Sequence, residues 1–298
     1  MNSWIEVKDE IEERVDSYLA KELNISRSKV QKLIKQGLVT VNEKVTSSNY
    51  IVKCGDLISV NDDLNFEYSL DAEDIDIDVI YEDSDLLVIN KASGMVVHPA
   101  PGHYSHTLVN ALLYRFQISG GEKYRPGIVH RLDKDTSGLM LVAKGEKIHE
   151  KLSRMIANKE VERHYLAIVD GVIKHDTGTI DAPIGRDANN RQKMAVTDVH
   201  GKEAITHFRV LETFSNHTLV ECILETGRTH QIRVHMAYIG HPVSNDPLYG
   251  RGKSTEFGQM LHSKSIKFKH PTTGKELFFE VDPPKEFLEK LEKLRENG

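Results

Sequence analysis

The sequence predicts a mixed α/β or α+β protein of two domains, a small helix–helix–hairpin unit followed by a larger domain of strands and interspersed helices. A chain of 298 residues favours about two domains and is long enough to bury a full core. Its composition, 39% hydrophobic and 28% charged, is typical of a globular protein. The charge balance changes sharply after residue 61, which marks the boundary between the two units.

The N-terminal unit is predicted to begin with two helices. Apolar residues recur at helical spacing over residues 5–24, at Val7, Ile11, Val15, Tyr18, Leu19 and Leu23. Ser26 is a plausible N-cap for a second, short helix that ends at Gly37, a plausible C′ residue. Residues 38–42 then predict a strand, followed by a turn at 42–44 and further strand-like pieces up to Val60.

This unit is basic. Between Arg27 and Lys44 there are five cations and one acid, Glu43; the cations are Arg27, Lys29, Lys32, Lys35 and Lys44. Several of them recur at helical spacing on one exposed side. A solubilising helix face is the alternative, but five cations in one small unit of an acidic protein favour contact with phosphates.

The next segment is acidic. Residues 62–85 contain eleven acids and neither Lys nor Arg. We therefore expect an N-terminal domain over 1–62, a linker over 63–75 and a second domain over 76–298, with an edge strand at 75–80.

The second domain alternates strands with helices. The expected strands are 86–90, 139–144, 165–169, 204–211 and 218–225. The expected helices are 106–117, 146–158 and 230–239, with a last helix that begins at Asp282-Pro283, where Asp282 is the cap and Pro283 the first helical residue.

Several classes of protein are disfavoured. No apolar run approaches the ~18 residues of a membrane span, and the N-terminus does not resemble a secretory signal. Cys54 and Cys222 lie far apart, so we expect free thiols and a reducing, cytoplasmic location. The net charge of −6 argues mildly against a nucleic-acid partner, but the charges are unevenly placed.

The stretch from Pro126 to Leu139 carries the main chemical signal. It places His130, Arg131, Asp133 and Asp135 between the apolar pair 128–129 and the apolar run 139–143, both expected to be buried strands. Polar residues on a rigidly held turn carry chemistry more often than the strands beside them. Residues 135–138 are better explained as a turn that fixes backbone geometry, whereas Arg131 and Asp133 are candidate functional residues.

A second candidate stretch runs from Leu224 to His235. Gly227 breaks a strand, and Thr229 can cap the helix that follows, which would point amides and Arg228 at an anion. His230 and His235 are five residues apart, which does not match the spacing of a zinc helix. Neither a dinucleotide fingerprint nor a phosphate-binding loop is present.

Together these residues resemble a known family. His130-Arg131-Leu132-Asp133-x-x-Thr136-Ser137-Gly138, with Gly227-Arg228-Thr229-His230-Gln231-Ile232-Arg233 downstream, is similar to the RluA-type pseudouridine synthases. Residues 13–60 resemble the S4 RNA-binding domain that precedes the catalytic domain in many of them. Within the family, the order of motifs is most similar to the large-subunit ribosomal RNA synthase D branch.

The resemblance implies a fold and a set of roles. It implies a curved, mixed and mostly antiparallel sheet with flanking helices and a central cleft, and a monomer that acts on RNA, most often 23S ribosomal RNA, without cofactor or metal. Asp133 matches the catalytic aspartate, and Arg131 the arginine that enters the RNA helix in place of the flipped uridine. Tyr165 matches the aromatic residue that stacks on the target base, Arg233 the cation that pairs with the aspartate, and Leu224 a pocket residue.

Three more substrate-binding residues are expected: Lys91, Arg228 and His230. Lys91 falls in the family's first motif, where this sequence departs by placing Ala92 at the usual proline.

The chemistry fits these residues. Converting uridine to pseudouridine breaks the N1–C1′ bond, turns the base and rejoins it through C5, which one ionised carboxylate held by a cation can serve as nucleophile or base. Two alternatives remain. A hydrolase could use Asp133 and Asp135 as a carboxylate pair, since residues two apart share a face of an extended strand. A non-catalytic protein could clamp RNA with both domains.

Overall fold

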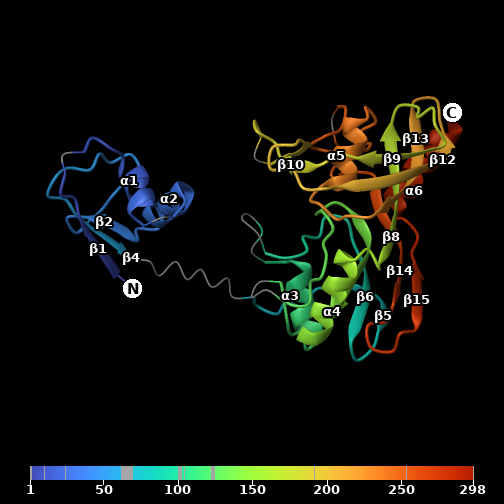
Figure 1. The fold of residues 1–298 in the computed structure, drawn as a ribbon, viewed down its shortest axis with the longest axis horizontal. Coiled ribbons are helices and arrows are strands. Elements are labelled where there is room, and N and C mark those ends of the chain that lie inside the picture. Colours follow the sequence, from blue (N-terminus) through green and yellow to red (C-terminus); the bar gives the residue numbers. More distant parts are fainter. Residues whose placement is uncertain are drawn as a thin grey trace. The chain divides into compact units, whose positions relative to one another are not determined.

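The chain folds into two compact units, Met1–Ser69 and Leu70–Gly298, in the computed structural model (Figure 1). The structure describes residues 2–9, 11–23, 25–61, 70–99, 103, 105–121, 125–190, 192–252 and 254–297. Residues 63–69 of the expected linker, and residue 62 before it, lie outside the described residues.

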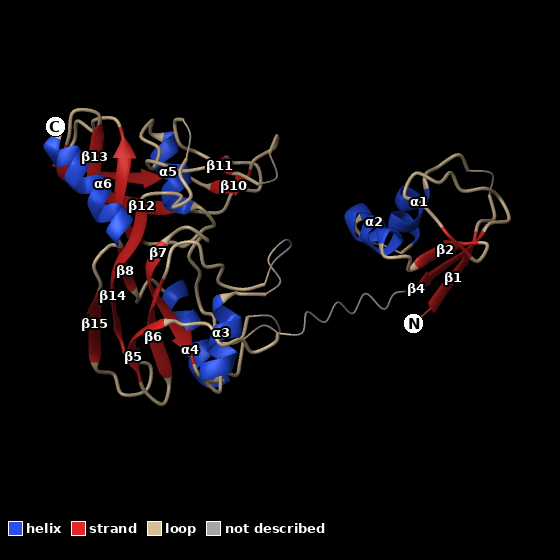
Figure 2. Ribbon diagram, turned by 180° about the vertical axis from the view of Figure 1, so that it is seen from behind, coloured by secondary structure: helices blue, strands red, loops and turns tan. Residues whose placement is uncertain are grey.

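The first unit packs two helices against a small antiparallel sheet, whose strand order is β1-β4-β2-β3. Its elements are β1 (Asn2–Glu6), α1 (Val15–Glu22), α2 (Arg27–Lys35), β2 (Val39–Val41), β3 (Lys44–Val45) and β4 (Leu57–Asn61). Figure 2 shows α1 and α2 together on one side of the sheet. Leu19 of α1, Leu33 of α2 and Ile58 of β4 are fully buried between them.

The expected helix over residues 5–24 is wrong in its first half. Residues 2–6 form β1, which pairs with β4 from Asn2↔Asn61 to Glu6↔Leu57, and the helix begins only at Val15. Trp4, Ile5 and Val7 suit a strand as well as a helix stripe, and pairing with β4 decides between them. The second helix is confirmed: the Ser26 Oγ accepts the Lys29 amide at 3.3 Å, and Gly37 has a φ of +71°.

A buried carboxylate joins the two helices. Asp16 of α1 is fully buried and accepts hydrogen bonds from Arg14, Arg27 and Gln31, the last at 2.7 Å. Burial works to raise the pKa of Asp16, but these three donors outweigh it and lower that pKa to about 2. Arg27, expected to contact RNA, therefore also fastens α2 to α1.

The second unit is built on one mixed sheet, and its predicted α+β class is confirmed. The described strands follow the order β5-β6-β7-β14-β8-β13-β12-β9, with β15 paired to β14. Only the β7–β14 pair is parallel among them. β10 and β11 form a separate two-stranded sheet.

The strands of this unit are β5 (Asp78–Glu82), β6 (Leu86–Lys91), β7 (Ser137–Ala143), β8 (Glu162–Asp170), β9 (Thr177–Asp181), β10 (Ile184–Arg186), β11 (Met194–Val196), β12 (Ile205–Thr213), β13 (His217–Leu224), β14 (Leu261–Lys269) and β15 (Glu276–Glu280). Its helices are α3 (Leu108–Arg115), α4 (Glu146–Ala157), α5 (Gln231–Tyr238) and α6 (Lys285–Glu296).

Both faces of the sheet are covered. Side chains of α3, α5 and α6 join one core with Met140 and Val142 of β7. Leu139 and Leu141 of the same strand face a second core with Leu152 of α4. A strand that is buried on both faces is a continuous apolar run, which is why the sequence predicts β7 clearly.

In the second unit, the strands that the sequence does not predict are β9, β10, β11, β14 and β15. β14 lies between β7 and β8, yet its buried positions include His262 and Ser263, so apolar patterning does not reveal it. The last helix also begins later than expected, at Lys285. Asp282 does not cap it and instead pairs with Lys264 at 3.0 Å.

Two further observations concern the described residues. No helix among them is long and apolar enough to cross a membrane. Cys54, which is exposed, and Cys222, which is buried, are both free thiols.

We expect Asp16→Asn to destabilise the first unit by about 1–3 kcal/mol, because it weakens the buried acceptor of four partly buried hydrogen bonds. The native pKa of Asp16 lies below its ordinary value, so its contribution is full above pH ~4 and is lost as the pH falls toward ~2. Urea unfolding followed at neutral and acid pH measures both effects. Glu22→Gln, the same change at an exposed site of α1, is the control, and equal losses in both variants would contradict the assignment.

Candidate active site

The candidate loop, residues 131–136, leads directly into β7. The Thr136 amide donates to the Asp133 carbonyl at 3.1 Å and closes a turn, while Leu132 points into the core. The expected strand at 128–129 is reduced to one bridge, Ile128↔Val142. Gly138 has a φ of +108°, and a Cβ there would overlap the backbone of Ser263 on β14, so glycine is required where the two parallel strands meet.

A buried lysine, Lys91, is hydrogen-bonded to this loop. Lys91 at the end of β6 is 2% exposed, and its Nζ donates to the carbonyls of Ala92, Met95 and Lys134 at 2.8–2.9 Å. Burial lowers the pKa of Lys91 to about 7, although Asp133 and Asp135 oppose that change. Lys91 thus connects the turn after β6 to the loop of residues 131–136. The backbone carbonyl of Ala92 is one of the three acceptors of its hydrogen bonds.

Asp133 is held by an arginine that a second carboxylate fixes in place. Arg233 of α5 donates through Nη1 to Asp133 Oδ2 at 2.8 Å. The same guanidinium makes a two-point contact with Asp246, Nε to Oδ2 at 2.6 Å and Nη2 to Oδ1 at 2.9 Å. Arg233 and Asp246 are 3% and 2% exposed, whereas the Asp133 side chain keeps 15% of its surface exposed.

The charges around Asp133 keep it ionised. Burial works to raise the pKa of Asp133, but the charges of His230 and Arg233 and the hydrogen bond from Arg233 outweigh it, so the pKa lies below its usual value. Burial lowers the pKa of His230 itself, so the charge of that ring is lost as the pH rises, whereas the Arg233 guanidinium stays charged. Arg233 is therefore the cation that stabilises the Asp133 carboxylate.

The start of α5 differs from the expected cap. His230, not Thr229, is the N-cap residue, and its φ of +58° places it in the left-handed region. The Gln231 side chain accepts the Arg228 amide at 2.9 Å. His230 reaches Tyr249 through Nδ1, 2.9 Å from the tyrosine Oη, and its Nε2 lies 3.9 Å from Asp133 Oδ1.

Asp133 stands between two cavities. One, of about 290 Å³, also contains Tyr165, Leu224 and Arg228 in its wall and is close to the ~300 Å³ at which small-molecule pockets begin. The other, of about 650 Å³, includes Lys134 and Asp135. Arg131, Leu132, Asp133, His230 and Arg233 line both.

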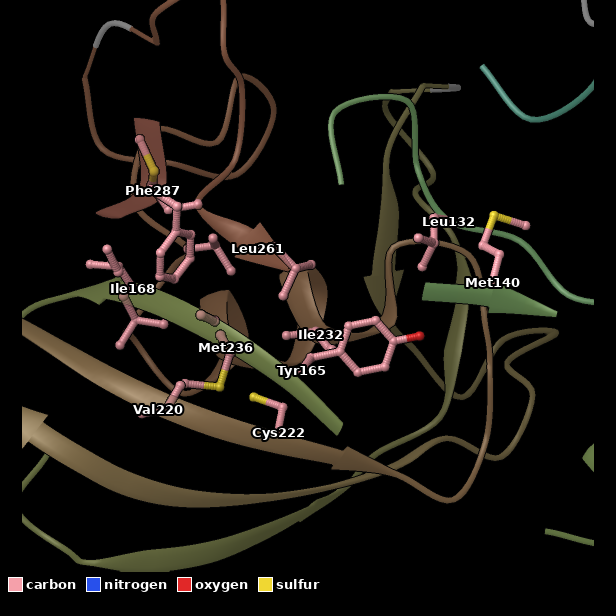
Figure 3. Close-up of a cluster of buried hydrophobic side chains, with 14 of the residues drawn as sticks. Leu132, Met140, Tyr165, Ile168, Val220, Cys222, Ile232, Met236, Leu261 and Phe287 are labelled. Atoms are coloured by element: carbon pink, nitrogen blue, oxygen red, sulfur yellow. The ribbon is translucent and has the colours of Figure 1, made fainter. Parts of the chain in front are cut away.

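Tyr165 forms part of the wall between the first cavity and the core. Its ring lies between Ile232 and Leu132 at the end of the apolar cluster in Figure 3, and the residue is almost fully buried. A flat apolar surface beside an ionised carboxylate can accept a planar ring and leave its edge near the charge.

The structure thus gathers seven of the expected site residues around one cavity: Arg131, Asp133, Tyr165, Leu224, Arg228, His230 and Arg233. Lys91 lies outside that cavity, and its contacts favour a positioning role. The five basic residues belong to the first unit, where Lys32, Lys35 and Lys44 are exposed and Lys29 is half-buried.

Sequence reasoning missed three residues: Arg163, Asp246 and Tyr249. Arg163 could have been found from strand periodicity, because it lies two residues before Tyr165 and shares its face of β8. Asp246 accepts the amides of Leu248 and Tyr249, a local turn pattern that indicates structure but not a partner on α5. No group of three or more His, Cys, Asp or Glu among the described residues could hold a metal ion.

Comparison with known proteins agrees with this geometry. Residues 85–238 match the family model for RNA pseudouridylate synthase, and residues 13–58 match the model for the S4 domain. The chain is 52% identical to an uncharacterized RNA pseudouridine synthase of Bacillus subtilis, over 96% of this chain and 95% of the relative. It is 46% identical to the ribosomal large subunit pseudouridine synthase D of Pseudomonas aeruginosa, over 91% of this chain and 88% of the relative.

Solved structures show the same likeness. Human RNA pseudouridylate synthase domain containing 1 superposes with a TM-score of 0.59 at 27% identity, covering 72% of this chain and 86% of that one. Human RNA pseudouridylate synthase domain containing 4 superposes with a TM-score of 0.57 at 25% identity, covering 73% and 93%.

We expect Asp246→Asn to destabilise the second unit by about 3 kcal/mol, because it breaks a buried two-point ion pair and leaves Arg233 partly unpaired. Asp133→Asn should cost only about 1 kcal/mol, because Arg233 keeps both contacts with Asp246. Urea unfolding of the two variants, which carry the same chemical change, measures the difference. Equal losses would mean that Asp246 does not anchor the arginine.

Proposed function

The chain belongs to the RNA pseudouridylate synthase family and carries an S4 domain at residues 13–58, and on that premise we propose that it isomerises uridines of large-subunit ribosomal RNA with Asp133 as the catalytic residue. The observation that carries the proposal is the ionised Asp133 carboxylate, which Arg233 holds at the edge of a cavity beside Tyr165. The choice of ribosomal RNA follows the relatives named ribosomal large subunit pseudouridine synthase D, which are 41–46% identical.

The cavity residues have separate roles in exposing and holding a uridine. A stacked uridine must leave the RNA helix before any group can reach it, at a cost of a few kcal/mol. Arg131 is exposed beside Asp133, so it can fill the space that the base leaves. Tyr165 and Leu224 offer the extruded base an apolar surface, and Arg228 and His230 line the same cavity.

The reaction itself needs only Asp133 in the ionised form. The carboxylate attacks the nucleotide or takes a proton from it, the N1–C1′ bond breaks, and the base rejoins the sugar through C5. C5 then loses its hydrogen as a proton and N1 takes up a proton, so the product is an isomer of the substrate. Arg233 keeps the carboxylate charged, and Asp246 keeps Arg233 in place. Lys91 donates a hydrogen bond to the Lys134 carbonyl and in this way holds the loop that carries Asp133.

The first unit supplies affinity for the RNA backbone. Its cations Arg27, Lys29, Lys32, Lys35 and Lys44 gather on one small domain and neutralise phosphates, which offsets the cost of unstacking.

We propose that the protein acts as a monomer in the cytoplasm. We also propose that its domains are 1–62 and 76–298, joined by a linker at 63–75, of which residues 70–75 belong to the second compact unit.

Asp133→Asn should abolish isomerisation and leave RNA affinity within about twofold, because the carboxylate acts on the reacting nucleotide and makes few binding contacts. Tritium release from RNA that contains 5-tritiated uridine measures the reaction, and filter binding measures affinity. Activity retained in this variant would reject Asp133 as the catalytic residue. Free uracil released by the wild type would instead indicate a hydrolase that uses Asp133 and Asp135.

Lys32→Gln combined with Lys35→Gln should weaken RNA binding and reduce the steepness of its salt dependence by about 1–2, because each phosphate contact contributes about one unit or less. Affinity measured over a range of salt concentrations gives the slope. Lys285→Gln with Lys293→Gln removes the same charge from exposed sites of α6 and serves as the control. An equal change in both double variants would show a general charge effect and not a contact by the first unit.

A further inference from the structure

We infer that Arg163 is the phosphate-binding residue of the nucleotide site, and that it takes a backbone phosphate next to the flipped uridine. The inference deepens the proposed function and rests on it for the identity of the ligand. It starts from the charged side chain of Arg163, which is buried and has no anionic partner among the described residues.

Arg163 is a buried cation without a partner in the described part of the chain. The residue is 3% exposed and lies on β8, yet none of the described residues makes a hydrogen bond or ion pair with it, and its Nε is fully enclosed without an acceptor. Arg233, equally buried, pairs with two carboxylates. A buried charge without compensation is costly to keep, so the contrast points to an anion that arrives from outside the chain.

His130 adds a second unsatisfied donor to the same cavity. Its Nε2 accepts the Leu141 amide at 2.9 Å, so in the neutral ring the proton is on Nδ1, which is buried without an acceptor. Burial, with a smaller contribution from the Arg163 charge, lowers the pKa of His130 to about 3, so the ring is neutral at pH 7. Both residues line the cavity of about 290 Å³ beside Asp133.

The space beside the guanidinium is kept open. Gly227 is exposed on the wall of the same cavity, and a Cβ at that position would lie 3.1 Å from Arg163 Nη1. A side chain at residue 227 would therefore crowd the guanidinium. The glycine therefore leaves space beside Nη1 at the cavity wall, while Nε is enclosed.

The position on β8 fits one nucleotide. Arg163 and Tyr165 are two residues apart on one strand, so their side chains share a face about 7 Å apart along it. A nucleotide carries its base and its phosphate on different sides of the ribose. With the base against Tyr165 and the sugar near Asp133, a phosphate reaches Arg163, whose planar fork suits phosphate oxygens.

The test uses Arg163→Gln, with Arg163→Lys as the conservative variant and Arg209→Gln as the control. Arg209 is an exposed arginine of the same sheet that pairs with Glu221 at 2.8 Å. Without RNA, we expect Arg163→Gln to melt at the same temperature as the wild type or higher, because it removes an unpaired buried charge. Inorganic phosphate should raise the melting temperature of the wild type and of Arg209→Gln more than that of Arg163→Gln. A marked fall in the melting temperature of Arg163→Gln, with an unchanged response to phosphate, would overturn the proposal and make Arg163 a structural residue.

A second set of experiments, with modified RNA, identifies which phosphate Arg163 binds. In the tritium-release assay, Arg163→Gln should lower kcat/KM by about 10- to 100-fold, with partial recovery in Arg163→Lys. A single neutral methylphosphonate on the 5′ or the 3′ side of the target uridine should lower the activity of the wild type but not lower that of Arg163→Gln further. An equal penalty in both proteins at both positions would overturn the proposal. If no RNA loses tritium with the wild type, the proposed function fails, and the phosphate titration still decides whether Arg163 binds an anion.

Discussion

The contact between Arg233 and Asp133 is the constraint on which the site depends. A carboxylate in a partly buried cavity tends to take up a proton, and a single cation at 2.8 Å prevents this. That cation would itself be unstable in the interior, so Asp246 holds it with two further hydrogen bonds. Asp246 is in turn fixed by the amides of Leu248 and Tyr249. The chain of partners runs from backbone to carboxylate to arginine and ends at Asp133, whose side chain is more exposed than that of Arg233 or Asp246.

The sheet places the two ends of this chain of contacts. Asp133 stands just before β7, and Arg233 lies in α5, which follows β13 after a short connection. Between β7 and β13 lie β14 and β8, so the arginine and the aspartate meet across the sheet although 100 residues separate them. Lys91 adds a third fixed point, because its three carbonyl contacts join the end of β6 to the Asp133 loop.

The three buried cations of the site differ in the hydrogen-bond acceptors that surround them. Lys91 uses backbone carbonyls, Arg233 uses carboxylates, and Arg163 has no acceptor among the described residues. The first two arrangements hold the protein's own groups in place. The third leaves a donor for something else, which for an RNA-modifying enzyme is most simply a phosphate. Burial alone therefore does not distinguish Arg163 from Lys91 and Arg233, whereas the lack of an acceptor does.

Several features could be predicted from the sequence because local physics decides them. β7 is an unbroken apolar run, α2 has its cap at Ser26 and its terminating Gly37, and the paired motifs around Asp133 and Arg233 indicate the chemistry. Other features depend on partners that are distant in the chain. Residues 2–6 suit a strand or a helix until β4 pairs with them, and the buried His262 and Ser263 of β14 are polar until the sheet encloses them. Thus the sequence by itself determined the family and many of the elements, and it singled out the candidate residues around Asp133 and Arg233. Only the tertiary structure decided that Asp246 holds Arg233 and that Arg163 is left unpaired, because an ion pair exists only where folding brings its two charges together.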